Sequence, residues 1–267
     1  MFDVDGVLID TEASYNEAVV QTVRWLVPDA PVDRATVALW KRSGDWNNDW
    51  DLAYGLYCWL RTPERAPSAS AATRTLAALR AEAGARAERS YAVVRGVFEE
   101  HYNGTDRAVL RYGVAPLIQN GTPLADRERI VLEAAHIAAL RACGVSKFGV
   151  VTGRVRADWE QVSARLPLPA DTVVATDEDG RKPDPAGLRM VLEHLAATAT
   201  VYLGDTLNDL RMVQALGASA PGVVHPVIRC GPADEPAYRA AGALSFIRSL
   251  GELPAAVRAL GADPPRY

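Results

Sequence analysis

The second half of the chain alternates short apolar segments with segments of helical periodicity, and no other feature restricts the fold so strongly. The apolar segments predict buried strands at 147–151, 172–175, 200–203 and 219–224. The periodic segments predict helices at 126–143, 155–166, 185–195 and 208–216. Short strands that alternate with helices indicate βαβ units, so the expected fold class is α/β with a parallel sheet.

A helical region precedes this α/β part. Helical spacing of apolar residues predicts helices at 14–26, 34–42, 49–60, 72–83 and 88–102. Ser14 and Glu17 have the spacing of a capping box at the first of them, and no alternating strand pattern occurs in the region. With 267 residues the chain is long enough for two domains, so we expect an all-helical domain at 14–121 inserted into a core formed by 1–13 and 122–267.

Distinctive polar residues occur at four predicted strand ends or loops. They are Asp3 and Asp5 near the N-terminus, Thr152, Gly153 and Arg154 after 147–151, Lys182 before the helix at 185–195, and Asp205 and Asp209 after 200–203. Because ligands of parallel sheets bind outside the carboxyl ends of the strands, we expect these residues to share one site. Two aspartates at one strand end cost several kcal/mol to desolvate unless a cation, protons or backbone donors compensate them. That cost indicates a function.

The strand that carries the first two aspartates is short. If Asp3 ends a central strand, only Met1 and Phe2 precede it, whereas strands usually run about five or six residues. We therefore expect either a short strand or a natural start upstream of Met1.

The four motifs, in this order, resemble those of the haloacid dehalogenase (HAD) superfamily: a D-x-D at the first strand, a Ser or Thr at the second, a Lys, and a G-D-x-x-x-D at the fourth. The resemblance covers roughly residues 1–13 and 122–250. It implies a Rossmann-like core with an inserted helical cap domain. The activity it implies is that of a Mg²⁺-dependent phosphatase, which hydrolyses the phosphate monoester of a small metabolite through an aspartyl-phosphate intermediate.

The resemblance also gives each motif residue a role. Asp3 matches the nucleophile, because a carboxylate that attacks phosphorus divides one difficult displacement into two easier ones. Asp5 matches the general acid that protonates the leaving oxygen and then activates water. Gly6 permits the turn that brings the Asp5 side chain back toward the site. Lys182 matches the cation that offsets charge on the nucleophile and the phosphate.

The remaining matches concern a metal ion and the phosphoryl group. The implied Mg²⁺ ligands are Asp3, Asp205 and Asp209 through their side chains and Asp5 through its backbone carbonyl. Asp209 would also serve to orient the lysine or the waters of the metal. Thr152 and Gly153 match the groups that, with Lys182, bind the phosphoryl oxygens.

The expected helical domain contains one stretch that suggests substrate contacts, around Trp46 and Trp50. Its candidate contacts are Arg42, Asn47 and Asn48. The aromatic rings could stack on a substrate, or Asn48 could cap the helix at 49–60 while both tryptophans pack between helices. In the core, Arg154 could reach a second anionic or hydroxyl group of the substrate, or pair at the surface.

Composition and charge argue against several partner classes. The net charge of −4 gives no electrostatic argument for nucleic acid or for an anionic membrane surface, and no apolar stretch is long enough to span a bilayer. No signal peptide is visible, and the three cysteines form no close pair, so a cytoplasmic location is expected. The expected partner is a small phosphorylated metabolite, held by local positive charge.

Several alternatives stay open at this point. A phosphosugar mutase of the same superfamily would return the phosphoryl group to the substrate instead of to water. A phosphonate-cleaving enzyme would need a lysine of the cap, where Lys41 is the only one. A non-catalytic binding protein could use the same fold, although no catalytic position is visibly replaced. A haloacid dehalogenase is disfavoured, because that chemistry needs no metal.

Overall fold

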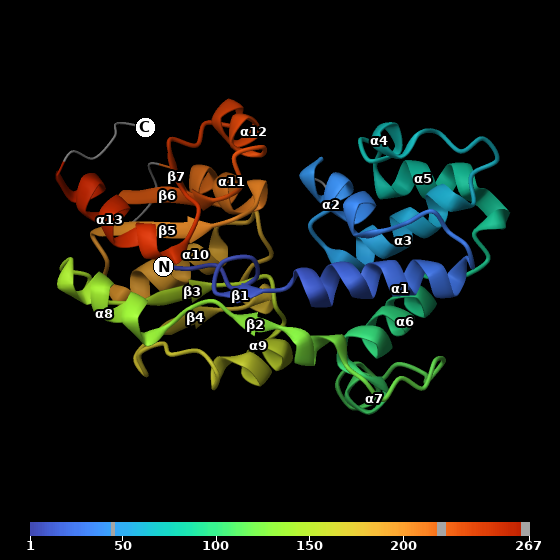
Figure 1. Cartoon of the computed structure of the whole chain (residues 1–267), viewed down its shortest axis with the longest axis horizontal. Coiled ribbons are helices and arrows are strands. Elements are labelled where there is room, and N and C mark those ends of the chain that lie inside the picture. The colour runs from blue at the N-terminus through green and yellow to red at the C-terminus, as the bar shows by residue number, and fades with distance from the viewer. Residues whose placement is uncertain (44–45, 218–222, 263–267) are drawn as a thin grey trace. The chain divides into compact units, whose positions relative to one another are not determined.

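The computed structural model describes residues 1–43, 46–217 and 223–262, and the chain divides into two compact units (Figure 1). Residues 1–10, together with the chain from Arg129 onward, form one unit, which we call the core unit. Thr11–Glu128 form the other, which we call the helical unit. Among the described helices, none combines the length and the apolar character needed to cross a membrane.

The core unit is built on parallel strands, as the sequence predicts. They are β3 (Gly149–Val151), β4 (Val173–Ala175), β5 (Ala199–Gly204), β6 (Val223–Arg229) and β7 (Ser245–Ile247). β3 pairs with β4, and β6 lies between β5 and β7. The strand expected at 219–224 is placed too early, because β6 continues through His225 and Pro226 to Arg229. Residues 219–222 lie outside the described part of the chain.

The N-terminal residues Phe2 and Asp3 lie between β3 and β5 in this sheet. Phe2 forms parallel bridges to Val150 on one side and to Leu203 on the other. The Phe2 N–H donates to the Gly149 carbonyl over 2.9 Å, and the Asp3 N–H donates to the Leu203 carbonyl over 2.8 Å. These bonds place Asp3 at the carboxyl edge of the sheet, beside the ends of β3 and β5.

Helices cover both faces of the sheet. One face carries α8 (Ala134–Ala142), α9 (Arg156–Ser163) and α13 (Leu253–Ala262). The other face carries α10 (Ala186–Leu195) and α11 (Leu207–Leu216). Val150 and Leu203 pack on the first face, whereas their neighbours Val151 and Tyr202 pack on the second. Burial on both faces is typical of parallel sheets and explains their apolar strands.

Two short antiparallel strands of the core unit were not predicted: β1 (Ile9–Asp10) and β2 (Arg129–Ile130). Because of β2, the helix expected at 126–143 is wrong at its start, and α8 begins only at Ala134. The N–H groups of Val131 and Leu132 both donate to the Leu8 carbonyl. These bonds to a distant segment stabilise extended backbone here and override the helical periodicity.

The helical unit consists, over its described residues, of helices and loops. Its α-helices are α1 (Glu17–Leu26), α2 (Arg34–Arg42), α3 (Asp49–Leu60), α4 (Ser68–Ala71), α5 (Leu76–Ala83), α6 (Tyr91–Asn103) and α7 (Thr105–Tyr112). α3 is central, with residues 52–60 all buried against α1, α5 and α6. The predicted helices at 34–42 and 49–60 are confirmed. The capping role of Ser14 is wrong, because its hydroxyl donates to the Thr11 carbonyl in a π-helical turn before α1.

Candidate active site

Asp3 is a buried carboxylate held by two donors. Its Oδ1 accepts a hydrogen bond from the Val4 N–H over 2.7 Å and lies 2.7 Å from Lys182 Nζ. Burial and the charge of Asp209 raise the pKa of Asp3 to about 7, despite the opposing charge of Lys182. Burial therefore disfavours the charged form of Asp3, and Lys182 offsets this effect only in part.

Lys182 is fixed between Asp3 and Asp209. Its Nζ lies 2.6 Å from Asp209 Oδ1, which also accepts a hydrogen bond from the Tyr202 hydroxyl over 2.8 Å. The second oxygen, Oδ2, accepts from the Thr206 hydroxyl over 2.7 Å and from the Thr206 N–H over 3.0 Å. Burial alone would lower the pKa of Lys182, but the carboxylates of Asp209 and Asp3 outweigh burial and raise it. The ammonium group therefore stays charged at neutral pH.

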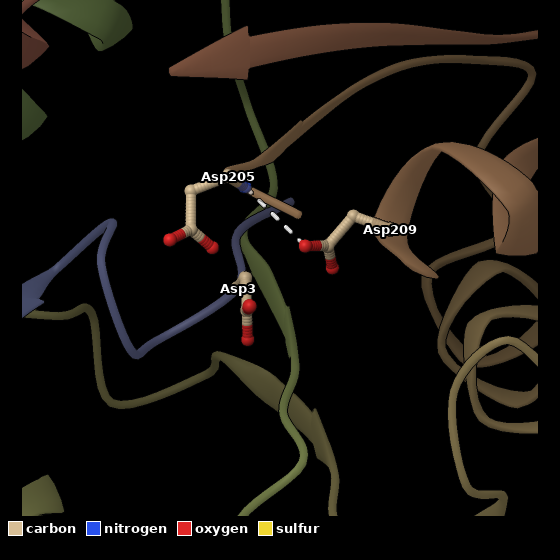
Figure 2. A group of neighbouring side chains, drawn as sticks. All are labelled: Asp3, Asp205 and Asp209. Carbon is tan, nitrogen blue, oxygen red and sulfur yellow. Dashed lines mark hydrogen bonds between the residues drawn. The ribbon is translucent and has the colours of Figure 1, made fainter. Parts of the chain in front are cut away.

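Asp205 offers a carboxylate oxygen that no donor satisfies. Its Oδ1 is buried and has no hydrogen-bond partner among the described residues. Carboxylate oxygens of Asp3, Asp205 and Asp209 lie within 4.8 Å of one another (Figure 2). Burial, and then the charges of Asp3 and Asp209, raise the pKa of Asp205 well above its usual range. Clustered hard oxygen donors with an unsatisfied buried oxygen fit a divalent cation.

The turn after Asp5 requires a glycine. Gly6 has a φ of 71°, and a Cβ placed there would lie 1.9 Å from Asp205 Oδ2. The Gly6 carbonyl accepts a hydrogen bond over 2.7 Å from Arg229 Nη1, at the end of β6. The missing side chain therefore lets the Asp205 carboxylate approach the backbone that carries Asp3 and Asp5.

Alanine in place of Gly6 is expected to lower the free energy of unfolding by about 3 kcal/mol or more, because a collision with Asp205 adds to the cost of a left-handed backbone. Gly113→Ala is the matched control, since Gly113 has a φ of 61° but nothing within 4 Å of its Cβ position. The control should lose only the backbone part, about 1–2 kcal/mol. Urea unfolding compares the two, and equal losses would show that Asp205 does not restrict position 6.

Arg154 and Asp5 form a second group of contacts in the site. Arg154 Nη2 lies 2.6 Å from Asp5 Oδ1, and only 1% of the Arg154 side chain is exposed. Pairing of Arg154 at the surface is therefore wrong, while its contact with a substrate stays a prediction. Thr152 is also buried, and its Oγ1 accepts a hydrogen bond from the Arg154 N–H over 3.1 Å. Gly153 between them is exposed.

The core unit places the residues predicted from the four strand ends at one edge of the sheet. They are Asp3, Asp5, Thr152, Gly153, Arg154, Lys182, Asp205 and Asp209. Strand pairing is the cause, since β3 and β5 lie on either side of the N-terminal segment and all three end at this edge. The site combines a buried carboxylate, a fixed ammonium group and an acidic cluster that could hold a cation.

Three residues that hold the site were missed from the sequence. Tyr202 donates to Asp209, Arg229 donates to the turn at Gly6, and the Tyr238 hydroxyl donates to the Asp205 carbonyl over 2.6 Å. Tyr202 carries a hydroxyl within the strand expected at 200–203, which was a usable signal, whereas Arg229 lies beyond the strand expected at 219–224 and carried none. Tyr238, in α12 (Glu235–Ala240), carried none.

The candidate substrate contacts of the helical unit have mixed outcomes. Asn48 caps α3, because its Oδ1 accepts a backbone N–H of the first turn over 3.0 Å. Trp46 is buried and donates to a backbone carbonyl, and Trp50 donates to a carboxylate of α6. For these three the packing alternative describes their contacts. Arg42 and Asn47 are exposed, and their contact with a substrate stays a prediction.

Solved structures of known proteins share this fold. Phosphatase Tt82 from Thermococcus thioreducens is 25% identical, with 86% of this chain and 92% of that chain covered and a TM-score of 0.62. CbbY from Rhodobacter sphaeroides, solved in complex with phosphate, is 21% identical, with 94% of each chain covered and a TM-score of 0.50. The second likeness supports the fold alone.

Sequence comparisons place the chain in a family. An imidazoleglycerol-phosphate dehydratase from Phytophthora nicotianae is 24% identical over 235 residues, and the match covers 85% of this chain but 43% of that relative. The chain thus spans less than half the length of the curated relative. The family model of haloacid dehalogenase-like hydrolases matches residues 1–217. With the acidic cluster and the lysine at the carboxyl edge of its parallel sheet, the chain belongs to the haloacid dehalogenase-like hydrolases.

Proposed function

We propose that this hydrolase is a Mg²⁺-dependent phosphatase that releases phosphate from the monoester of a small metabolite through a phosphorylated Asp3. The observation that carries the proposal is the buried Asp3 carboxylate, held by Lys182 beside the unpartnered Oδ1 of Asp205. A carboxylate nucleophile needs such charge compensation to meet a phosphate dianion. The similarity to a protein described as a phosphatase, at 25% identity, supports the same activity.

The proposed reaction has two steps. Asp3 attacks phosphorus, the bond from phosphorus to the leaving oxygen breaks, and Asp5 donates a proton to that oxygen. Asp5 then takes a proton from the water that attacks the phosphorylated Asp3, so phosphate leaves and the Asp3 carboxylate is restored. Lys182 offsets the negative charge that gathers on the phosphoryl oxygens, which Thr152 and Gly153 bind through hydroxyl and N–H groups.

Asp3, Asp205 and the Asp5 carbonyl would hold Mg²⁺, whose charge offsets the repulsion between the nucleophile and the phosphate. For Asp209, the ion pair with Lys182 supports its other expected role, which is to orient the lysine. Asp3 and Asp205 are therefore the side chains that we assign to the metal.

We assign the choice of substrate to the helical unit, in the role of a cap. Arg42 and Asn47 are exposed there and remain candidates for contact with the leaving group. Lys41, which a phosphonate-cleaving enzyme would use, lies 2.8 Å from an Asp49 carboxylate oxygen. An ammonium group held by a carboxylate is a poor amine nucleophile, so this pair favours the phosphatase.

Phosphate release from a panel of phosphorylated sugars, nucleotides and related metabolites, with Mg²⁺ present, tests the proposal. We expect free phosphate from at least one compound with the wild-type chain. An isomerised sugar phosphate in place of free phosphate would identify a mutase. No release from the wild type, with the same result for Asp3→Asn, would overturn the proposal.

Mg²⁺ is expected to raise the melting temperature of the wild type by about 5 °C at a concentration of about 100 times its Kd, because binding to the folded state alone contributes about 2.7 kcal/mol. Asp205→Asn should lose most of this shift. Without the ion, the variant should be more stable than the wild type, since burial and like charges disfavour the Asp205 carboxylate. Differential scanning fluorimetry with Mg²⁺ and with EDTA measures both effects.

The difference in stability between the wild type and Asp205→Asn without Mg²⁺ is expected to depend on pH. A carboxyl group whose pKa is higher in the folded state binds its proton more tightly there, so stability is lost as pH rises above about 4 toward the raised pKa of Asp205. The extra stability of Asp205→Asn without Mg²⁺ should therefore grow with pH.

Asp10→Asn is the control for the Mg²⁺ effect and should keep the shift in melting temperature. An unchanged shift in Asp205→Asn would place the ion elsewhere.

A further inference from the structure

Arg154 holds Asp5 by a forked ion pair. Arg154 Nη2 lies 2.6 Å from Asp5 Oδ1, and Arg154 Nε lies 3.0 Å from Oδ1 and 3.2 Å from Oδ2. The Asp5 side chain is 29% exposed, whereas that of Arg154 is 1% exposed. The Asp5 carboxylate is thus partly exposed to solvent, whereas the Arg154 guanidinium that pairs with it is buried.

The backbone of Arg154 is anchored on both sides. Its N–H donates to Thr152 Oγ1 over 3.1 Å, and its carbonyl accepts a hydrogen bond from the Asp177 N–H over 3.0 Å. A planar guanidinium on an anchored backbone fixes the plane of the carboxylate that it contacts at two points. The loop after β3 therefore sets the orientation of the Asp5 side chain.

We propose that Arg154 is the positioning residue of the acid and base Asp5, an inference that rests on the proposed phosphatase function. Asp5 must meet two targets in turn, the leaving oxygen and then the attacking water, and a partly exposed aspartate would otherwise sample several rotamers. Asp5 Oδ1 receives the two shorter contacts, so Oδ2 is the oxygen that exchanges the proton. Arg154 contacts Asp5 directly, so in this role it acts on the reaction through Asp5.

The rival role for Arg154 is direct contact with the substrate. A substrate contact made equally in the ground state and the transition state would raise KM and leave kcat unchanged when removed. A positioning residue for Asp5 would instead lower kcat, and only in steps that need the acid or the base. The two roles therefore predict different kinetic changes.

Rapid-mixing kinetics with p-nitrophenyl phosphate, whose leaving group departs without a proton, separates these steps. In Arg154→Met the burst of p-nitrophenolate should stay within about threefold of the wild type, while steady-state turnover, which needs Asp5 as base, should fall about 10²-fold. With glycerol phosphate, whose alkoxide needs the acid, the first step should fall as well. Arg154→Lys, which keeps the charge but not the fork, should regain part of the turnover.

A double variant and a control variant test the positioning role of Arg154 further. In an Asp5→Asn background, Arg154→Met should have little further effect on turnover, because the side chain that it positions has lost its function. Arg156→Met is the matched control, since the Arg156 side chain is 53% exposed and pairs with Asp179. Three results would overturn the positioning role and leave the proposed phosphatase function intact. They are equal losses in burst and turnover, a rise in KM alone, and full additivity with Asp5→Asn. A wild type that releases neither p-nitrophenolate nor phosphate from any compound of the metabolite panel would overturn both.

Discussion

Asparagine in place of Asp3 is expected to lower the rate of phosphate release by roughly 10⁴-fold or more. The neutral amide cannot form the bond to phosphorus, so only binding and charge stabilisation around the site remain. The fold should survive, because the amide oxygen can accept the hydrogen bond that the Val4 N–H gives to Asp3 Oδ1. Steady-state phosphate release and acid trapping of the phosphorylated protein measure the loss.

Asp10→Asn is the matched control for Asp3→Asn. Asp10 follows Asp3 on the same segment, its side chain is 38% exposed, and its carboxylate lies 2.9 Å from the Arg129 guanidinium. Loss of an exposed pair of this kind should leave phosphate release within about twofold of the wild type. Wild-type release by Asp3→Asn, or an equal loss in Asp10→Asn, would show that Asp3 is not the nucleophile.

The fold class could be predicted because strands buried on both faces leave continuous apolar segments in the sequence. Strand limits were harder to predict, as β6 shows. Its polar His225 is buried, and Pro226, which lacks an N–H, precedes Val227, where pairing with β7 begins at Ser245. Neither residue interrupts the strand, yet both end an apolar segment in the sequence. Tertiary pairing decided where this strand ends.

The membership of the site could be predicted because the carboxyl ends of neighbouring parallel strands meet at one edge. Its internal contacts could not. Arg154 and Asp5 are 149 positions apart in the chain, and their pairing depends on two side-chain rotamers and one loop. Asp209 illustrates the same limit, because the sequence allowed it to bind the metal or to orient Lys182. The contacts that support the second role, namely the hydrogen bonds on its two oxygens and the ion pair with Lys182, could not be predicted from the sequence.

The substrate could not be predicted from the sequence, because one residue type can serve either as a helix cap or as a substrate contact. Asn48 has one side-chain oxygen, which can cap a helix or accept a hydrogen bond from a ligand, and both uses favour the same residue type before a helix. The structure shows it in the capping role. Residues of the helical unit therefore have to be assigned to a substrate by measurement, beginning with the exposed Arg42 and Asn47.

Methionine in place of Lys182 is expected to reduce both activity and stability. The turnover number should fall by about 10²–10³-fold, because the charge that stabilises the phosphoryl oxygens is lost. The free energy of unfolding should fall by about 3–5 kcal/mol, because the buried Asp209 loses its counterion, 2.6 Å away in the wild type. Lys147→Met, at an exposed lysine of the core unit, should change stability by less than about 1 kcal/mol.

The double variant Lys182→Met, Asp209→Asn separates the two losses. Asparagine removes one of the two buried charges that Lys182 pairs and keeps an oxygen to accept the Thr206 hydroxyl, so part of the stability lost in Lys182→Met should return in urea unfolding. Phosphate release should stay as low as in the single variant, because nothing replaces the ammonium group beside Asp3. Recovery of activity with stability would mean that Lys182 acts only by holding the fold. Recovery of stability alone would place its charge in the reaction.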